Sequence, residues 1–390
     1  MIRESGRYLE GGIFRRVFGS SLWMGLTRRG VYPAGLSETL NVLTIERSAP
    51  YETTPAWTAM SVSDGAEGGM CLPSTTALVT GSTSRSFQLY RKALEGPDFC
   101  AEEFRTVFQL TERLNRITDS FAENVRLQWE MQDRNEYFKW CKTKVIVNGC
   151  PPATDTTTAA SWSTVASNTS STVPTSKMTQ GVLDRFYLKL VRDGATPVAR
   201  LGTGAPVLAY VAEAEVLDGL IRDNSDIRQD YRWSKPFELL AGLGVERVYR
   251  NYIHMQDLYP NRYTASGATY TKVATFAQSS ATKGYKAEIN PSWETATYTE
   301  SFIHSPSVME QLVPQPIVAP GTHFQFNPVN YTGTMKVMNI PNRTCNPDGN
   351  IIYHRMIMAA ASKPEYPEHG VAFITLRCDP PCNLITACAS

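Results

Sequence analysis

The sequence predicts an α+β fold built around one unusually long helix. A stripe of apolar residues at helical spacing, free of proline and glycine, lies within residues 99–144, and shorter helical patterns follow it. From about residue 269 onward the chain alternates and is rich in Thr, Tyr and Val, which is typical of strands. With 390 residues, 42% of them hydrophobic and 19% charged, the chain is long enough for two or three subdomains of a folded protein.

The first 70 residues or so show little periodicity and many glycine and proline breaks, and residues 40–45 carry their clearest strand pattern. We expect an extended arm or loop that gains order by lying on neighbours. Deletion of residues 1–30 should therefore leave the subunit folded. Those thirty residues hold six arginines and two glutamates, an excess of four positive charges. Such an end is either a solvated terminus or a contact for nucleic acid or an acidic partner.

The long helix has a start signal and a continuous apolar stripe. Pro97 and Asp98 are typical of a helix start, and Glu102 and Glu103 suit its first turns. Apolar residues then recur at steps of mostly three and four: Phe104, Val107, Phe108, Leu110, Leu114, Ile117, Phe121, Val125 and Trp129. The pattern predicts a helix of about 40 residues, roughly 60 Å long, either a coiled coil or a long spine over a sheet.

Shorter elements follow the long helix. Residues 145–147 read as a strand that ends in an Asn-Gly turn, and residues 151–176, dominated by Thr, Ser and Ala, read as a loop too polar for a core of its own. Residues 179–193 carry apolar side chains at i, i+3, i+4 and i+7, and Gly194 can cap that helix. A strand over residues 206–211 and a third helix over about 212–222 complete the middle of the chain.

Candidate chemistry is sparse. The five histidines lack metal-site spacing, and the nucleophile elbow and the phosphate loop are absent. Cys378, Cys382 and Cys388 could hold zinc with His354 or His369, or form disulfides, but free thiols are the favoured interpretation because no knuckle-like turn separates them. We therefore predict no catalytic, cofactor-binding or metal-binding residue. The net charge of +1 excludes a bulk polycation, and the absence of a long apolar run excludes a membrane helix.

The C-terminal third contains the most specific sequence motifs. It contains Trp293-Glu294, then Phe302-Ile303-His304, then a run from Ser307 that includes Pro314-Gln315-Pro316, and it closes with the segment Pro364-Glu365-Tyr366-Pro367-Glu368-His369-Gly370. This part of the chain resembles the C-terminal half of a tailed-bacteriophage major capsid protein. Most of the chain is similar to that family in the order of its secondary-structure elements, and only the C-terminal third is similar in its sequence motifs.

The resemblance implies a Hong Kong 97-type capsid fold, with an N-terminal arm, a long spine helix, and peripheral and axial domains. Residues 1–70 correspond to the arm and part of the extended loop, and residues 71–177 to the peripheral domain with the spine helix and the Ser/Thr-rich loop. Residues 178–265 correspond to the axial domain, and residues 266–390 to a β-rich return into the axial and peripheral domains. Eight cysteines are many for this family.

The resemblance also implies a function without enzymatic activity. The chain would self-assemble into hexamers and pentamers of the icosahedral shell that encloses phage double-stranded DNA, and it would reside in the virion after assembly in the host cytoplasm. Scaffold, portal and decoration proteins and non-specific contact with packaged DNA are the further partners expected, with no membrane. Three alternatives stay open at this point: an encapsulin-like compartment shell, another virion component such as a tail or decoration protein, and an α+β enzyme with a Cys/His site.

Overall fold

The computed structural model describes fifteen stretches of the chain: residues 22–32, 39–45, 82–88, 90–95, 99–100, 110–149, 151–157, 159–170, 173–200, 205–223, 245–249, 251–278, 285–314, 334–341 and 350–377. The chain divides into two compact units, and Leu36–Leu89 form the smaller one. In that unit β2 (Thr39–Ile45) and β3 (Ser82–Gln88) pair antiparallel along their full length. The strand expected at residues 40–45 is therefore confirmed.

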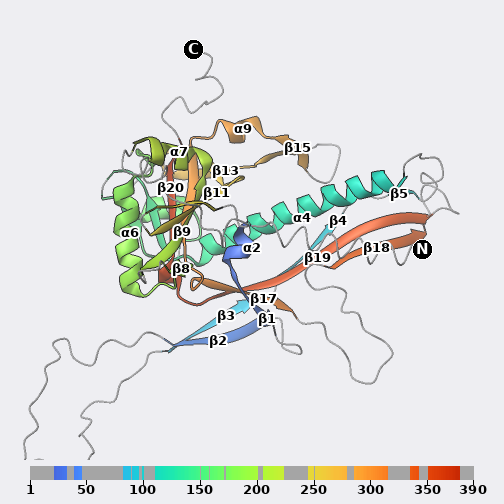
Figure 1. Cartoon of the computed structure of the whole chain (residues 1–390), viewed down its shortest axis with the longest axis horizontal. Helices are drawn as coiled ribbons and strands as arrows, with labels where there is room; N and C mark the ends of the chain where they lie inside the picture. Colours follow the sequence, from blue (N-terminus) through green and yellow to red (C-terminus); the bar gives the residue numbers. More distant parts are fainter. Residues whose placement is uncertain are drawn as a thin grey trace, which may run out of the picture. The chain divides into compact units, whose positions relative to one another are not determined.

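A ten-stranded sheet forms the centre of the larger unit (Figure 1). Seven of its strands follow one another in the order β10 (Val245–Tyr249), β11 (Tyr252–Asp257), β9 (Pro206–Glu213), β16 (Tyr298–His304), β20 (Val371–Leu376), β6 (Thr143–Ile146) and β7 (Ala153–Asp155). Three further strands join this series at its side: β8 (Ala199–Arg200) pairs with β9, β12 (Arg262–Ser266) pairs with β16, and β13 (Thr269–Val273) pairs with β12. The central strands β9, β16 and β20 are buried almost throughout, because helices cover both faces of the sheet.

Two apolar cores lie on the two faces of this sheet. On one face α6 (Gln180–Asp193) and α7 (Ala214–Asp223) pack against side chains such as Tyr210 and Phe373. On the other face α4 (Leu110–Trp140), α5 (Trp162–Thr169) and α2 (Leu22–Leu26) pack against side chains such as Val207 and Phe302. Alternate residues of a strand face opposite sides, so β9 contributes Val207, Ala209 and Val211 to one core and Leu208, Tyr210 and Ala212 to the other.

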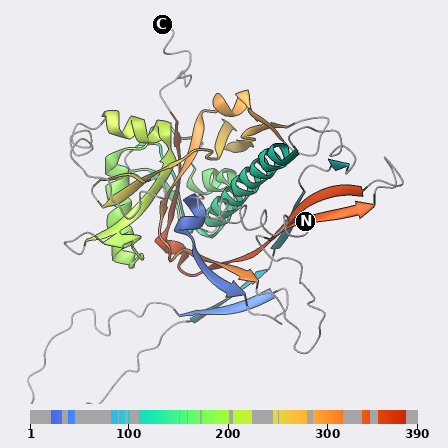
Figure 2. The same ribbon diagram turned by 45° about the vertical axis from the view of Figure 1, so that its right-hand side comes forward.

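The second large sheet of this unit has six strands, and β19 is the strand with which most of the others pair. β19 (Asn350–Pro364) spans 15 residues and pairs with β17 (Met309–Pro314), β4 (Tyr90–Glu95), β5 (Phe99–Cys100) and β18 (Thr334–Pro341), while β1 (Arg28–Tyr32) adds in parallel to β17. Two views show α4 and β19 extending from the ten-stranded sheet toward the same side (Figures 1 and 2). The remaining elements are β14 (Phe276–Gln278), β15 (Tyr285–Ile289), α9 (Pro291–Glu294) and the 3-10 turn η3 (Pro367–His369).

Several local predictions are confirmed. The helix expected over residues 179–193 is α6, and Gly194 ends it in the left-handed conformation at φ 84°. The strand and helix expected after residue 206 are β9 and α7, and the Asn-Gly turn follows β6 with Gly149 at φ 129°. None of the described helices is long and apolar enough to cross a membrane.

Three expectations are corrected. The long helix does not begin near residue 99, because Phe99 and Cys100 pair as β5 with Ile352 and Ile351 of β19; the described helix spans Leu110–Trp140. The Ser/Thr-rich stretch is not only a loop, because Ser161 caps α5 and Trp162 of that helix is 1% exposed. Residues 22–32 do not need a neighbouring subunit to become ordered, because they pack against their own chain. Deletion of residues 1–30 would therefore remove part of the core, contrary to the expectation that the subunit would stay folded.

Candidate functional site

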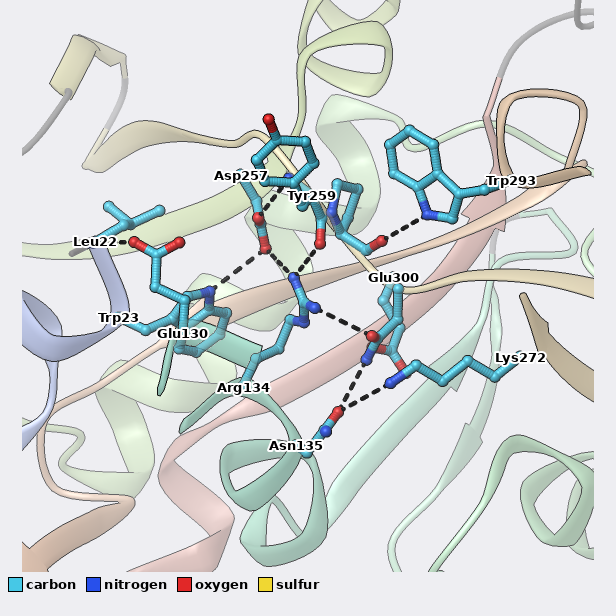
Figure 3. A network of polar contacts seen from close by, with 12 residues as sticks. Leu22, Trp23, Glu130, Arg134, Asn135, Asp257, Tyr259, Lys272, Trp293 and Glu300 are labelled. Carbon is cyan, nitrogen blue, oxygen red and sulfur yellow. Dashed lines mark hydrogen bonds and ion pairs between the residues drawn. The ribbon is translucent and has the colours of Figure 1, made fainter. Parts of the chain in front are cut away.

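A buried polar junction lies where the last turns of α4 meet the ten-stranded sheet (Figure 3). The Arg134 side chain is 2% exposed, and its guanidinium donates to three acceptors. These are Asp257 Oδ2 at 2.9 Å, the carbonyl oxygen of Tyr259 at 2.6 Å and Asn261 Oδ1 at 3.1 Å. All three acceptors come from the end of β11 and the turn into β12, so one planar donor group holds that turn to the helix.

Trp23 of α2 belongs to the same junction. Its indole Nε1 donates to Asp257 Oδ2 at 3.3 Å, and the backbone N–H of Leu22 donates to Glu130 of α4 at 3.0 Å. The Trp23 ring is fully buried, with its centroid 5.6 Å from that of Tyr137 and 5.2 Å from that of Phe302. Apolar burial and a charge-assisted hydrogen bond therefore anchor α2 to α4 and β16.

Glu300 of β16 forms the second half of the junction. The carboxylate is 2% exposed and accepts from Trp162 Nε1 at 2.6 Å, Tyr263 Oη at 2.6 Å and Asn261 Nδ2 at 2.7 Å. Among the described residues no cation lies within ion-pair distance of it, so three donors stabilise the buried charge. Burial, and then the Glu300 charge, raise the pKa of Tyr263 well above its usual value, so this hydroxyl stays a donor.

Asn261 joins the two halves of the junction. Its Oδ1 accepts from Arg134 and its Nδ2 donates to Glu300, while Asn135 Oδ1 accepts from Asn261 Nδ2 at 3.2 Å and from Lys272 Nζ at 3.2 Å. The strong hydrogen-bonding groups face one another rather than an open space. Five separate pieces of chain meet here: α2, α4, α5, the segment from the end of β11 to β13, and β16. The arrangement is suited to fixing the direction of α4 relative to the sheet.

A second ionic cluster holds the motif residues Trp293 and Glu294. Arg262 pairs with Glu213, and its guanidinium lies 3.5 Å from the centroid of the Trp293 ring. Arg377 pairs with Glu215 and donates to the backbone carbonyl of Glu294. Burial raises the pKa of Glu215, and the neighbouring Glu213 charge adds to the effect. The four ionisable groups of this largely buried site are therefore arranged in pairs of one acid and one base.

Among the described residues, Ser307 and His369 come nearest to the arrangement of a nucleophile and its base. Ser307 Oγ lies 2.8 Å from His369 Nδ1, and His369 Nε2 lies 3.1 Å from the carbonyl oxygen of Asp193. Ser307 Oγ also lies 2.7 Å from Ser305 Oγ, and both serines and the histidine are buried. The hydrogen bonds connect the β16–β17 corner, η3 and the end of α6. Both ring nitrogens of His369 have partners inside the fold, so this side chain joins these three elements.

The remaining candidates from the sequence are the cysteines and His354. Cys378, Cys382 and Cys388 lie outside the described residues, as does the side chain of His354. Cys141 is buried, and burial raises the pKa of its thiol to about 12, so it is not a thiolate at neutral pH. The described part of the chain contains no cluster of three or more metal-ligating side chains.

The residues that make the junction were not found from the sequence. Arg134 is 123 positions from Asp257, and Trp162 is 138 positions from Glu300. On their own helix or strand, Arg134, Asp257 and Glu300 fit a solvent-exposed face, and no local spacing in the sequence indicates their partners. The one available signal was the mixed apolar and charged character of the last turns of the long helix, between Trp129 and Trp140.

Comparisons with known proteins gave similar solved structures and no match by sequence. No protein-family model and no curated protein matches the sequence. The chain is similar to the capsid of cyanophage Pam1, with a TM-score of 0.49 at 10% identity over 90% of this chain and 89% of that one. It is also similar to the capsid of Ralstonia phage GP4, with a TM-score of 0.48 at 10% identity over 91% and 88% of the two chains. The head of Helicobacter pylori bacteriophage KHP40 gives a TM-score of 0.44 at 9% identity over 91% of each chain.

Proposed function

We propose that the chain is a major capsid protein that self-assembles into the icosahedral shell enclosing phage double-stranded DNA. The observation that carries the proposal is the presence of two unusually long elements, α4 and β19, beside the packed ten-stranded sheet. At 31 residues, α4 is roughly 46 Å long, and β19 at 15 residues is roughly 50 Å long. Both extend beyond the ten-stranded sheet (Figures 1 and 2). Elements of this length offer contact area to several neighbours, which a shell subunit needs.

The polar junction supports the same role. A long helix transmits a defined geometry to a neighbour only when its base is fixed. Arg134 and Tyr137 fix it here, since the Tyr137 hydroxyl donates to the carbonyl oxygen of Ile303 at 3.0 Å and Arg134 binds the β11–β12 turn. The described polar clusters all serve such joints, and this favours a structural subunit over the Cys/His enzyme alternative. We therefore assign the chain no enzymatic activity.

The division of the chain follows the resemblance. We assign residues 71–177 to a peripheral domain, residues 178–265 to an axial domain and residues 266–390 to the β-rich return. The separate β2–β3 unit, Leu36–Leu89, supports an extended loop, which begins inside the stretch assigned to the arm (residues 1–70). The described residues 22–32 differ from an arm because they are held by their own subunit.

The expected assembly is a homo-oligomer of hexamers and pentamers in the virion, formed in the host cytoplasm. Rings of identical subunits need head-to-tail contacts that close by rotation. The small net charge of +1 limits repulsion between many packed copies. Contact with packaged DNA needs only scattered positive side chains and no base recognition. Scaffold, portal and decoration proteins are the further partners that such a shell would take.

Expression of the chain alone tests the proposal. We expect light scattering to detect species far larger than a dimer, and negative-stain images of that fraction to show closed shells or rings of five or six subunits. Co-expression with a candidate scaffold protein is the second arm, because some shells close only with one. A folded chain that stays a monomer or dimer in both arms would overturn the proposed function.

A further inference from the structure

The turn Asn148-Gly149 after β6 is a sequence motif that neither the polar joints nor the proposed shell uses. It is the only place in the chain where an asparagine precedes a glycine. The backbone nitrogen that follows an asparagine can attack the side-chain amide and close a five-membered ring, and such an intramolecular attack has a high effective concentration. Glycine offers the least hindered nitrogen for this attack because it has no Cβ.

The turn is open where the ring would form. Asn148 is exposed, and both residues lie outside the helices and strands, between β6 and β7. Gly149 has a φ of 129°, which a residue with a side chain rarely adopts, and an added Cβ would meet no atom within 4 Å. The backbone N–H of Gly149 has no hydrogen-bond partner within the described stretches of the chain. The attacking nitrogen and the space for the ring are therefore both available.

The side-chain amide of Asn148 is oriented by β7. Its Oδ1 accepts from the backbone N–H of Ala153 at 3.0 Å. When a nitrogen adds to Cγ, that carbon becomes tetrahedral and Oδ1 takes up negative charge. A backbone N–H that already binds this oxygen stabilises the charge, as the donors of an oxyanion hole do. Ala153 is the register partner of Ile146 in β6, so the strand pair holds the donor in place.

We propose that Asn148 is a modification site at which the chain converts its own asparagine through a cyclic imide. Gly149 N loses its proton to solvent and bonds to Asn148 Cγ, and the bond from Cγ to Nδ2 breaks, so that Nδ2 leaves as ammonia. One water molecule then opens the imide. Attack of water at Cγ gives aspartate, and attack at the main-chain carbonyl carbon gives isoaspartate. The conversion consumes one water and releases one ammonia, without oxidation or reduction.

The fold can accept both products. Val147 donates its N–H to the carbonyl oxygen of Ile374 at 3.1 Å and accepts at its own carbonyl from Ser176 at 3.2 Å, so the backbone is held up to the residue before Asn148. The additional backbone carbon of isoaspartate falls at exposed Asn148 itself. Either product adds a negative charge and lowers the formal net charge of the chain from +1 to zero. The modified subunit therefore stays folded with a different charge.

Incubation of the purified, folded chain at pH 8 and 37 °C tests the site, with peptide mapping by mass spectrometry as the readout. We expect the peptide that carries Asn148 to be replaced by two isomers with the mass of the aspartate form, at least about tenfold faster than at Asn124. Asn124 is the matched internal reference, because it is exposed but lies within α4 and precedes a valine. Asn148→Gln is the control variant, since its longer side chain cannot close the five-membered ring.

Each further result decides one part of the inference. An unchanged mass at Asn148, a rate no higher than at Asn124, or the same product from Asn148→Gln would overturn the site. Ala153→Pro removes the N–H donor at the first position of a strand, where proline is tolerated, and should slow the conversion at least about threefold; an equal or higher rate would overturn the role of Ala153. Asn148→Asp should unfold at the same urea concentration as wild type, and a lower midpoint would contradict the tolerance of the fold. The inference goes beyond the proposed function, because none of these readouts depends on assembly.

Discussion

Replacement of Arg134 by methionine tests the polar junction most sharply. Methionine keeps the length of the side chain and removes its charge, so Asp257, whose side chain is 8% exposed, loses its cation. The carbonyl oxygen of Tyr259 and Asn261 Oδ1 lose their donor at the same time. Removal of one partner from a buried ion pair costs about 3–5 kcal/mol. We expect a decrease of that size in the free energy of unfolding, measured by urea denaturation of unassembled subunits at pH 7.5.

Two further variants separate the junction from a general effect on the helix. Lys139→Met removes a charge from the same helix, but the Lys139 side chain is 46% exposed and its Nζ lies 3.7 Å from Glu136, so the expected loss is below about 1 kcal/mol. Arg134→Met combined with Asp257→Asn should be more stable than the sum of the two single effects predicts, because no uncompensated charge remains. An Arg134→Met subunit within about 1 kcal/mol of wild type would refute the reasoning.

Three other predictions concern the core around Tyr137. Trp23→Ala should lower the free energy of unfolding by about 3–5 kcal/mol, because a fully buried indole leaves a cavity, and urea denaturation would measure it; an unchanged midpoint would show that α2 is not anchored. Gly370→Ala should destabilise by about 1–3 kcal/mol in thermal or urea unfolding, because the added Cβ would lie 2.5 Å from the Tyr137 hydroxyl and 2.8 Å from Val308 Cγ2; a neutral effect would contradict this packing. Burial lowers the pKa of His304 to about 3 from its ordinary 6.5. Between these two values the unfolded chain binds a proton at this histidine and the folded subunit does not. The free energy of unfolding is therefore highest above pH 6.5 and decreases as the pH falls toward 3. Between pH 7.5 and 5.0 the wild-type subunit should lose about 2 kcal/mol through this group, and His304→Phe should show a pH dependence smaller by that amount; an equal dependence would contradict the assignment.

Elements whose signals are local were predicted from the sequence. The apolar spacing of α6 and its glycine cap are both contained within residues 179–194, and the alternation around β9 reflects burial on two faces. The start of α4 was placed wrongly because Pro97 and Asp98 are a local signal, whereas Phe99 and Cys100 pair with a strand some 250 residues later. Tertiary pairing overrides local propensity in such cases.

The polar junction shows the limit of sequence reasoning at the site. A helical arginine such as Arg134 fits a solvated face until the turn carrying Asp257 and Tyr259 is known to cover it. Likewise, the Thr- and Ser-rich stretch before α6 gave no sign that Trp162 would anchor a short helix against Glu300. The segment around Trp293 is different. Its sequence resembled a motif of a known family, and in the structure Arg262 stacks on Trp293 while Arg377 binds the backbone carbonyl of Glu294.

The size and form of the largest species that the purified chain makes would show whether the chain forms shells. We would express the chain alone and with a candidate scaffold protein, measure the molar mass by light scattering and image the largest fraction. We predict closed shells, or rings of five or six subunits on the way to them. A folded chain that remains a monomer or dimer under both conditions would contradict the claim that this is a shell-forming subunit.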